Sequence, residues 1–264
     1  MSNKFPFDQS GGRGNCATAS ARSSQNKLLF ISDLHLALEK REITRRFLSF
    51  LQSRATQAQA LYILGDLFDT WVGDDDNTLL NRTIKAALRD LVDRGTEVYL
   101  IQGNRDFLLG ERFSQETGVI LLDEYAVIEI GGRATLLTHG DLLCTDDLPY
   151  QAFRIKSRSA EWQRNVLSKP LWLRLLAARW YRLRSFFHKR GKTQDIMDVN
   201  SQTVLDCLRR FSCTRLIHGH THRPATYHFE LDGLEMQRMV LADWSKDQGE
   251  VLCWDGQDFL REVI

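Results

Sequence analysis

Five short polar clusters in this sequence contain residue types that bind metal ions and phosphate groups. They are Asp33-Leu34-His35, Gly65-Asp66, Gly103-Asn104-Arg105-Asp106, His139-Gly140-Asp141 and His218-Gly219-His220-Thr221-His222. Together they supply carboxylates, an amide and imidazoles but no thiolate, and this donor set suits Mn, Fe, Zn or Mg rather than thiolate-seeking metals. The clusters therefore predict a metal centre built from oxygen and nitrogen donors.

The spacing within the clusters supports the same interpretation. Side chains two residues apart on a strand point the same way, so the pairs Asp33 with His35 and His218 with His220 can each reach one site. Glycines beside the polar residues permit tight backbone paths at crowded strand ends; they are Gly65, Gly103, Gly140 and Gly219. A single Gly-Asp or His-Gly pair after a strand usually marks only a turn. Five such clusters in order, each after an apolar run, indicate a functional site instead.

Each cluster follows an apolar run that is typical of a buried strand. These runs span 28–32, 60–64, 97–102, 133–138 and 215–217, and helices are predicted over 39–54 and 77–94. Strands that alternate with helices predict a layered α/β core, and ligands bind such sheets at the carboxyl ends of the strands. Further strands are predicted at 119–122, at 125–130 and after 214, which favours two sheets flanked by helices.

The overall composition is that of an ordinary globular protein. The 264 residues carry a net charge of +1, with 26% charged and 43% hydrophobic residues, which excludes disordered and fibrous classes. The five cysteines form no CxxC pair, so we expect a reducing compartment and neither a disulfide framework nor a zinc–cysteine cluster. No apolar run approaches the roughly 18 residues of a membrane span. Residues 1–26 lack the apolar core of a secretory signal and are predicted to be a disordered extension of a domain at 27–264.

One segment concentrates positive charge. Residues 154–192 contain twelve basic side chains and one acidic one, interleaved with Trp and Leu, and Pro170 is placed to begin a helix. Such a segment is typical of a surface that meets anionic lipid. A helical hairpin that packs its apolar face on the core is an alternative compatible with the first. A nucleic-acid surface is less favoured, because bulky aliphatic side chains do not form stacking platforms.

The series of clusters resembles the calcineurin-like metallophosphoesterase superfamily. The resemblance implies an α/β fold, a four-layer α/β/β/α sandwich, with a centre of two ions, of which Mn²⁺ is the expected kind and Mg²⁺, Fe²⁺ or Zn²⁺ remain alternatives. It assigns one ion to Asp33, His35, Asp66 and His220, and the other to Asp66, Asn104, His139 and His218. Asp66 bridges the ions, and Asp66, Asn104, Arg105 and His139 are the expected catalytic residues. A pair of ions activates a water for in-line attack on phosphorus. Arg105 can neutralise phosphate charge but stays protonated, so it does not act as an acid.

Flanking motifs narrow the resemblance to the UDP-2,3-diacylglucosamine pyrophosphatase family. They lie at 73–76, 103–110, 139–147, 150–154, 196–200 and 216–224. The resemblance implies that water attacks the α-phosphate of UDP-2,3-diacylglucosamine, giving UMP and 2,3-diacylglucosamine 1-phosphate (lipid X) in lipid A biosynthesis. Helices at about 148–193 would form a lid over the acyl chains, its cations facing the diphosphate or lipid headgroups. The implied substrate contacts are Asn104, Arg105, Asp147, Ser185, Lys189, Lys192 and His218, where Lys189 departs from the Asn of the family pattern.

The same resemblance predicts a peripheral protein on the cytoplasmic side of the bacterial inner membrane. The expected partners are the lipid–nucleotide substrate and an anionic membrane surface, with no nucleic acid and no obligate protein partner. Two other functions remain open: a phosphoesterase that acts on soluble nucleotides or phosphoproteins, and a metal-binding scaffold without activity. The basic helical segment favours the lipid substrate, because small soluble substrates do not need it.

Overall fold

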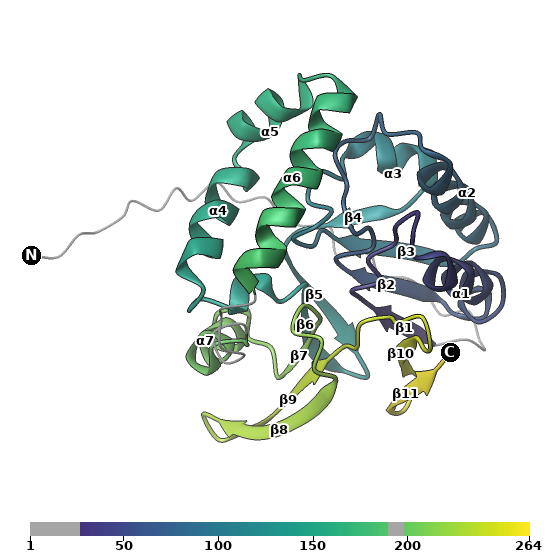
Figure 1. Cartoon of the computed structure of the whole chain (residues 1–264). Coiled ribbons are helices and arrows are strands. Elements are labelled where there is room, and N and C mark those ends of the chain that lie inside the picture. The colour runs from purple at the N-terminus through teal and green to yellow at the C-terminus, as the bar shows by residue number, and fades with distance from the viewer. Residues whose placement is uncertain (1–26, 190–197) are drawn as a thin grey trace, which may run out of the picture.

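The first three apolar runs lie side by side as parallel strands. The structure, a computed structural model, describes residues 27–189 and 198–264, without the side chains of 181–189. The first sheet has the order β11-β10-β1-β2-β3-β4, and its strands are β1 (Leu28–Ile31), β2 (Ala60–Leu64), β3 (Glu97–Ile101), β4 (Ile120–Leu122), β10 (Glu250–Trp254) and β11 (Phe259–Val263). Strands β1 to β4 are parallel, whereas β10 and β11 are antiparallel to their neighbours. The clusters after β1, β2 and β3 therefore reach the same edge of this sheet (Figure 1).

A second sheet carries the remaining two clusters. Its order is β5-β6-β7-β9-β8, and its strands are β5 (Tyr125–Ile130), β6 (Arg133–Thr138), β7 (Arg215–His218), β8 (Ala225–Leu231) and β9 (Leu234–Val240). The central strands β6, β7 and β9 are parallel, and the hairpins β5–β6 and β8–β9 close the two sides. All four residues of β7 are buried, as expected for a central strand covered on both faces.

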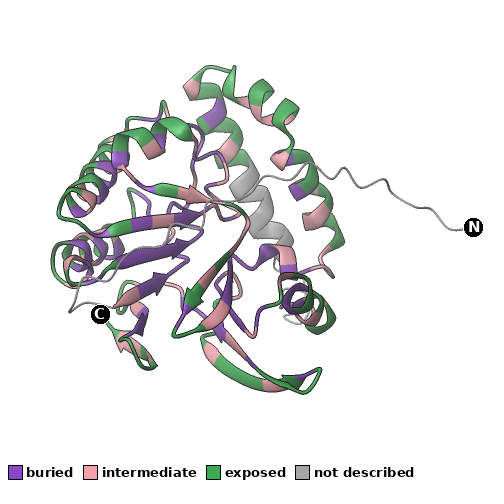
Figure 2. Ribbon diagram, turned by 180° about the vertical axis from the view of Figure 1, so that it is seen from behind, coloured by how far each residue is buried: buried purple, intermediate pink, exposed green. Residues whose placement is uncertain are grey.

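Three apolar clusters define the layers. One packs α1 (Arg41–Gln52), α2 (Leu79–Asp93) and α3 (Glu111–Thr117) on the first sheet. A second lies between the two sheets, and a third packs α7 (Ser201–Phe211) on the second sheet. This arrangement is the predicted α/β/β/α sandwich, and the strands in the middle of each sheet are largely buried (Figure 2). Helices α3 and α7 were not predicted, and the other two helices are shorter than expected.

Three consecutive helices follow β6 and form the basic segment. They are α4 (Leu148–Arg158), α5 (Ala160–Leu167) and α6 (Leu171–Lys189), called the helical segment α4–α6 below. Asp147 and Ser159 cap α4 and α5 through their side chains, and α6 begins directly after Pro170, as predicted. No helix in the described residues is both long enough and apolar enough to cross a membrane. The predicted disordered extension, 1–26, lies outside the described residues.

Three arginines attach the helical segment α4–α6 to the sandwich. Arg154 bonds to the carboxylates of Asp141 and Glu124, and Arg158 donates to the backbone oxygen of Gly103 at 2.9 Å. Arg174 forms an ion pair with Asp75 and binds the backbone oxygen of Val72. These three cations therefore pair with carboxylates and backbone oxygens of the sandwich, so the expectation that the segment's cations face the diphosphate or lipid headgroups rests on the others.

Candidate two-metal site

The five polar clusters converge where the two sheets meet. The loop after β1 runs beside the loop after β2, because Asp33 N donates to the Gly65 oxygen at 3.1 Å and His35 N donates to the Asp66 oxygen at 2.9 Å. The loop after β7 reaches the same place, since His220 N donates to Asp33 Oδ2 at 2.8 Å. Asp33 and Asp66 are buried, at 0% and 2% exposure. Two buried carboxylates are destabilising unless a cation or a proton balances their charge, which makes this point the candidate site.

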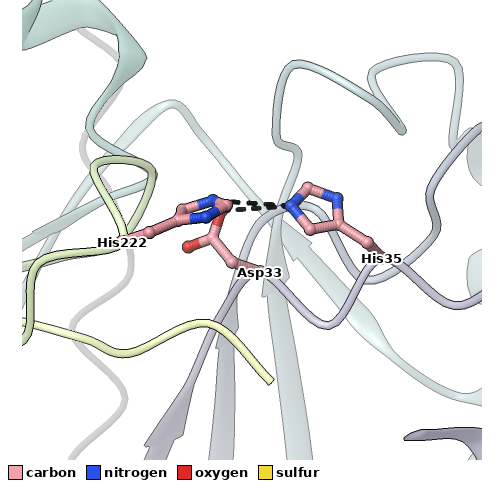
Figure 3. Close-up of side chains that lie close together, drawn as sticks. All are labelled: Asp33, His35 and His222. Carbon is pink, nitrogen blue, oxygen red and sulfur yellow. Dashed lines mark hydrogen bonds and ion pairs between the residues drawn. The ribbon is translucent and has the colours of Figure 1, made fainter. Parts of the chain in front are cut away.

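One group of donors gathers around Asp33. Its Oδ1 lies 3.8 Å from His35 Nε2 and 3.2 Å from His222 Nε2. The two imidazole Nε2 atoms are 3.5 Å apart, and Figure 3 shows both rings directed toward the carboxylate. Atoms of these three residues form a group compact enough to hold one metal ion.

A second group gathers around Asn104. Its Oδ1 lies 3.0 Å from His139 Nε2 and 2.9 Å from His220 Nδ1, and the two imidazole nitrogens are 3.2 Å apart. Asp66 lies between the groups: its Oδ1 is 3.8 Å from His139 Nε2, and its Oδ2 is 3.7 Å from His35 Nδ1. This position is the one that a carboxylate shared by two ions must occupy.

The histidines after β7 are distributed differently from the sequence-based assignment. His220 lies with Asn104 and His139 rather than with Asp33 and His35. His218 is buried with Nδ1 2.9 Å from the Gly219 oxygen, and no described hydrogen bond or ion pair joins it to another predicted ligand. His222, which the sequence reasoning did not select, occupies the place beside Asp33. The sequence does contain a signal for this residue, because His222 is the third histidine of the cluster after β7, two residues beyond His220.

Glycine is required where the loops touch the ligands. Gly65 has φ +87°, and a Cβ there would lie 2.4 Å from Nδ1 of His139. A Cβ on Gly103 would lie 2.2 Å from Oδ1 of Asp66. Real Cβ atoms do not approach neighbours this closely, so the predicted role of these glycines in close backbone paths is confirmed at both positions.

Burial and charge set the protonation of the site. Burial lowers the pKa of His35 and of His220 to about 3 and that of His218 to about 4, so all three imidazoles are neutral near pH 7. At His139 burial acts in the same direction, but the carboxylates of Asp66, Asp33 and Asp141 outweigh it and raise the pKa to about 9. Burial also raises the pKa of Asp66 to about 7. A neutral imidazole is the form that binds a metal.

The donors fit divalent cations. His35 Nδ1 and His218 Nε2 are buried nitrogen atoms without a hydrogen-bond partner among the described residues. Such atoms are destabilising unless something binds them, and an unprotonated imidazole nitrogen is a metal ligand. The oxygen and nitrogen donors of both groups match Mn, Fe, Zn or Mg.

A cavity of about 690 Å³ opens from these donors toward the helical segment α4–α6. At one end Asn104, Arg105, His220 and His222 line it. Toward the helices its walls become largely apolar, with contributions from Phe107, Leu108, Trp162, Val166, Leu173 and Ala177. The cavity thus joins a cation-binding end to an apolar end.

The predicted substrate contacts are only partly described. Arg105 lines the cavity, and its backbone N donates to Asp66 Oδ1 at 2.8 Å. Asp147 also lines the cavity while its side chain caps α4. The predicted contacts Ser185, Lys189 and Lys192 lie outside the residues whose side chains are described.

Comparison with known proteins identifies the family. Among solved structures, vacuolar protein sorting 29 from Cryptosporidium parvum is 17% identical, with a TM-score of 0.46 over 90% of each chain. Residues 26–224 match the calcineurin-like phosphoesterase family. Two relatives called UDP-2,3-diacylglucosamine hydrolase, from Yersinia pseudotuberculosis and Yersinia pestis, are each 50% identical over 216 residues, which cover 82% of this chain and 90% of theirs. The chain therefore belongs to the calcineurin-like phosphoesterases and, among them, to the family of the UDP-2,3-diacylglucosamine hydrolases.

Proposed function

We propose that this protein hydrolyses the pyrophosphate bond of UDP-2,3-diacylglucosamine in lipid A biosynthesis, releasing UMP and 2,3-diacylglucosamine 1-phosphate. The substrate is the one that the names of the 50% identical relatives state. The observation that carries the proposal is the single cavity that extends from the carboxylate and imidazole donors to the apolar side chains of the helical segment α4–α6. A diphosphate joined to two acyl chains has the same division between a charged end and an apolar end.

We propose that two divalent ions, Mn²⁺ in the first instance, bind at the two groups of donors. Six of the seven predicted ligands lie there together with His222: Asp33, His35, Asp66, Asn104, His139 and His220. The seventh, His218, is joined to neither group by a described hydrogen bond or ion pair. When bound, such ions polarise the phosphate oxygens and lower the pKa of a coordinated water. Asp66, which lies between the two groups, would hold both ions, and His139 is oriented by the contact of its Nδ1 with the Leu64 oxygen at 2.8 Å.

Arg105 complements this centre with a permanent positive charge. It follows the ligand Asn104 directly and lines the cavity, so its guanidinium is placed to neutralise charge on the phosphate oxygens. It stays protonated and therefore does not donate a proton to the leaving group. A sugar 1-phosphate leaves as a phosphate monoester and needs little protonation, which is consistent with attack of water at the α-phosphorus.

The apolar end of the cavity accommodates the acyl chains in this proposal. Each buried CH₂ contributes about 0.8 kcal/mol, so two long chains supply ample binding free energy. The remaining proposed contacts to the substrate are Asn104, Asp147, Ser185, Lys189, Lys192 and His218.

We further propose that the outer surface of the helical segment α4–α6 binds an anionic membrane. Trp172 is 63% exposed and Leu176 57% exposed, and Arg164 and Arg179 are exposed on the same helices. Exposed aromatic and aliphatic side chains combined with cations are typical of surfaces that enter a lipid headgroup region. The corresponding location is peripheral, on the cytoplasmic side of the bacterial inner membrane.

The test of the activity is product analysis in isotopic water. The purified protein is incubated with Mn²⁺ and UDP-2,3-diacylglucosamine in H₂¹⁸O, and we expect UMP that carries the label. Label in the sugar phosphate would contradict attack at the α-phosphorus. Phosphate release from simple nucleotides without UMP formation would favour a soluble phosphoesterase, and tight metal binding without any hydrolysis would favour a scaffold.

A further inference from the structure

Three consecutive aspartates lie in the loop between β2 and α2, outside both groups of metal donors. Asp74 Oδ1 accepts a hydrogen bond from Trp71 Nε1 at 3.0 Å, and its Oδ2 accepts from Phe113 N of α3 at 3.0 Å. Asp76 Oδ1 accepts from Thr78 N, directly before α2, at 3.2 Å. The first and third carboxylates therefore hold the loop to the helices of the first sheet, and the aspartate between them has a different partner.

That aspartate, Asp75, pairs with Arg174 of α6. Both terminal nitrogens of the guanidinium donate to the carboxylate, Nη1 to Oδ1 at 2.8 Å and Nη2 to Oδ2, which is the strong two-point geometry of such pairs. The same guanidinium donates to the Val72 oxygen, and its Nε donates to the Lys169 oxygen at 2.9 Å. The hydrogen bond from Arg174 lowers the pKa of Asp75, so the pair is charged near neutral pH. Arg174 is therefore fixed both to the loop and to the residues just before α6.

The loop is shaped around this arginine. Gly73 has φ +136°, and a Cβ there would lie 2.3 Å from Nη1 of Arg174 and 2.9 Å from Cδ2 of Leu167. A residue with a side chain would therefore push the guanidinium away, whereas glycine allows the close approach. An ion pair formed on an open surface needs no such fit, so this pair is a built contact between the loop and the helical segment α4–α6.

The described side chains of α6 offer no apolar attachment to the sandwich. Among residues 171–180, the part of α6 whose side chains are described, only Arg174 is buried. None of these residues belongs to the three apolar clusters of the sandwich. Leu173 and Ala177 instead line the cavity, as does Trp71 of the loop. The ion pair thus holds together two elements that both form walls of the cavity.

We propose that Arg174 and Asp75 are positioning residues that hold α6 in place as a wall for the acyl chains of the substrate. The inference rests on the proposed function and adds to it how the apolar end of the cavity keeps its shape. Because an ion pair makes the attachment, the apolar side chains of α6 stay available to acyl chains instead of packing on the core. Loss of the pair releases this wall and leaves both groups of metal donors in place.

The test compares two substrates in Asp75→Asn, a change that removes the charge and keeps the shape of the side chain. Asp75 is half-exposed, so the variant should fold. We expect kcat/KM for UDP-2,3-diacylglucosamine to fall about tenfold, because the buried guanidinium loses its charged acceptor. The value for the same UDP-sugar without acyl chains should stay close to that of the wild-type protein, whereas a general structural defect would lower both.

A second variant and a double variant show whether the two residues act as a pair. Arg174→Gln should produce the same selective loss as Asp75→Asn. The double variant, Asp75→Asn with Arg174→Gln, should be about as active on the acylated substrate as either single variant, because residues that act through one contact are not additive.

Hydrogen exchange of backbone amides reports on α6 without any turnover. In Asp75→Asn the amides of residues 171–180 should exchange at least about tenfold faster than in the wild-type protein, because local opening of the helix costs less free energy. The matched control is Asp232→Asn. Asp232 forms a similar two-point contact with Arg209, at 2.8 and 2.9 Å, and neither residue lines the cavity. The control should leave the exchange of α6 and both kcat/KM values unchanged.

The outcomes separate the inference from the proposed function. An equal loss of kcat/KM for both substrates in Asp75→Asn, or an unchanged kcat/KM for the acylated one, would overturn the inference. Absence of UMP release by the wild-type protein would defeat the proposed substrate. In that case, faster exchange of α6 in Asp75→Asn would still support its attachment by the ion pair, and unchanged exchange would overturn it.

Discussion

Asp66 is the residue on which the proposed chemistry depends most. Its two carboxylate oxygens face different groups of donors, one at His139 and the other at His35. The neighbouring backbone holds the Asp66 side chain in place. Arg105 N donates to Oδ1 of Asp66, and the carboxylate lies so close to Gly103 that a Cβ on residue 103 would clash with it. Asp66 is therefore positioned to contact both groups of donors.

We predict that Asp66→Ala abolishes turnover. Loss of the shared ligand weakens both ions and removes several kcal/mol of stabilisation from the transition state, which corresponds to a fall in kcat of about 10³-fold or more. UMP release measured at saturating Mn²⁺ checks this, with circular dichroism as the control for folding. Residual activity near one tenth of wild type would argue against an ion pair bridged by Asp66.

The protonation of His139 predicts a pH dependence of metal binding. Its pKa is raised to about 9 in the metal-free protein by the carboxylates around it, so near pH 7 the ring carries a proton that a metal must displace. Mn²⁺ affinity should therefore increase with pH, by up to about tenfold per unit below pH 9. Calorimetric titrations in buffers of different ionisation enthalpy should detect proton release. Metal affinity that does not change between pH 6 and pH 9 would show that His139 is already neutral.

The residue types of the site could be predicted from the sequence, but the arrangement of its histidines could not. The prediction relied on the alternation of side chains along a strand, and β7 ends at His218. Beyond it the backbone turns, with φ +70° at His220 and +54° at His222. In that conformation residues two apart no longer share a direction. Motif spacing therefore predicted that Asp33, Asp66 and Asn104 converge, and they do lie at the meeting point of the two sheets, whereas only the loop geometry shows which histidine faces which carboxylate.

At the level of elements, α4 connects the apolar part of the cavity to the ligand loop. Arg158 donates to Oε1 of Gln102 at 2.8 Å and to the backbone oxygen of Gly103 at 2.9 Å. The same guanidinium lies 5.3 Å from the centre of the Phe107 ring, which lines the cavity. The position of the helical segment α4–α6 is thereby coupled to the residue directly before Asn104.

We predict that Arg158→Lys reduces kcat/KM by about tenfold while Mn²⁺ stoichiometry stays at the wild-type value. Lysine keeps the charge but loses the planar fork, and an unsatisfied part-buried acceptor costs about 1–3 kcal/mol. Steady-state kinetics with the lipid substrate gives the measurement. Arg164→Lys, on the exposed face of α5, is the matched control. Equal kinetics in the two variants would show that α4 does not position the ligand loop.

The elements that the sequence predicted best are the buried strands. The runs before the ligands are apolar throughout, and β1, β2, β3 and β6 lie within one residue of the predicted limits. Helix α3 was missed because it is only seven residues long, with Phe113 as its buried apolar anchor. Helix α7 does have a helical signal: Asn200 caps it, and it buries Val204, Cys207 and Leu208 on one face. The helix was not predicted because the high positive charge of residues 154–192, just before it, is the more conspicuous sequence feature of this region.

At the scale of the whole molecule, the net charge of +1 conceals a strong asymmetry. Residues 154–192 carry a large positive excess, and the remainder of the chain is negative. Three of these basic residues, Arg154, Arg158 and Arg174, pair with carboxylates or backbone oxygens of the sandwich. The exposed remainder, together with Trp172 and Leu176, lies on the outer face of the helical segment α4–α6, which we propose is the side that meets lipid.

We predict binding to anionic vesicles that weakens as salt is added, because charge attraction across exposed surfaces is screened beyond about 8 Å at physiological ionic strength. Flotation at low and high salt measures it. The double substitution Trp172→Ala with Leu176→Ala should reduce binding at both salt concentrations. Leu234→Ala, an exposed leucine on β9, serves as the control. Absence of binding at low salt would contradict a membrane-facing helical segment.

The central claim is that one cavity couples a two-ion hydrolytic centre to recognition of acyl chains. The most direct test compares kcat/KM for UDP-2,3-diacylglucosamine with that for the same UDP-sugar without its acyl chains, at saturating Mn²⁺. We expect the deacylated compound to be worse by about 10³-fold or more, since burial of each CH₂ contributes about 0.8 kcal/mol. Equal kcat/KM for the two compounds would contradict the account.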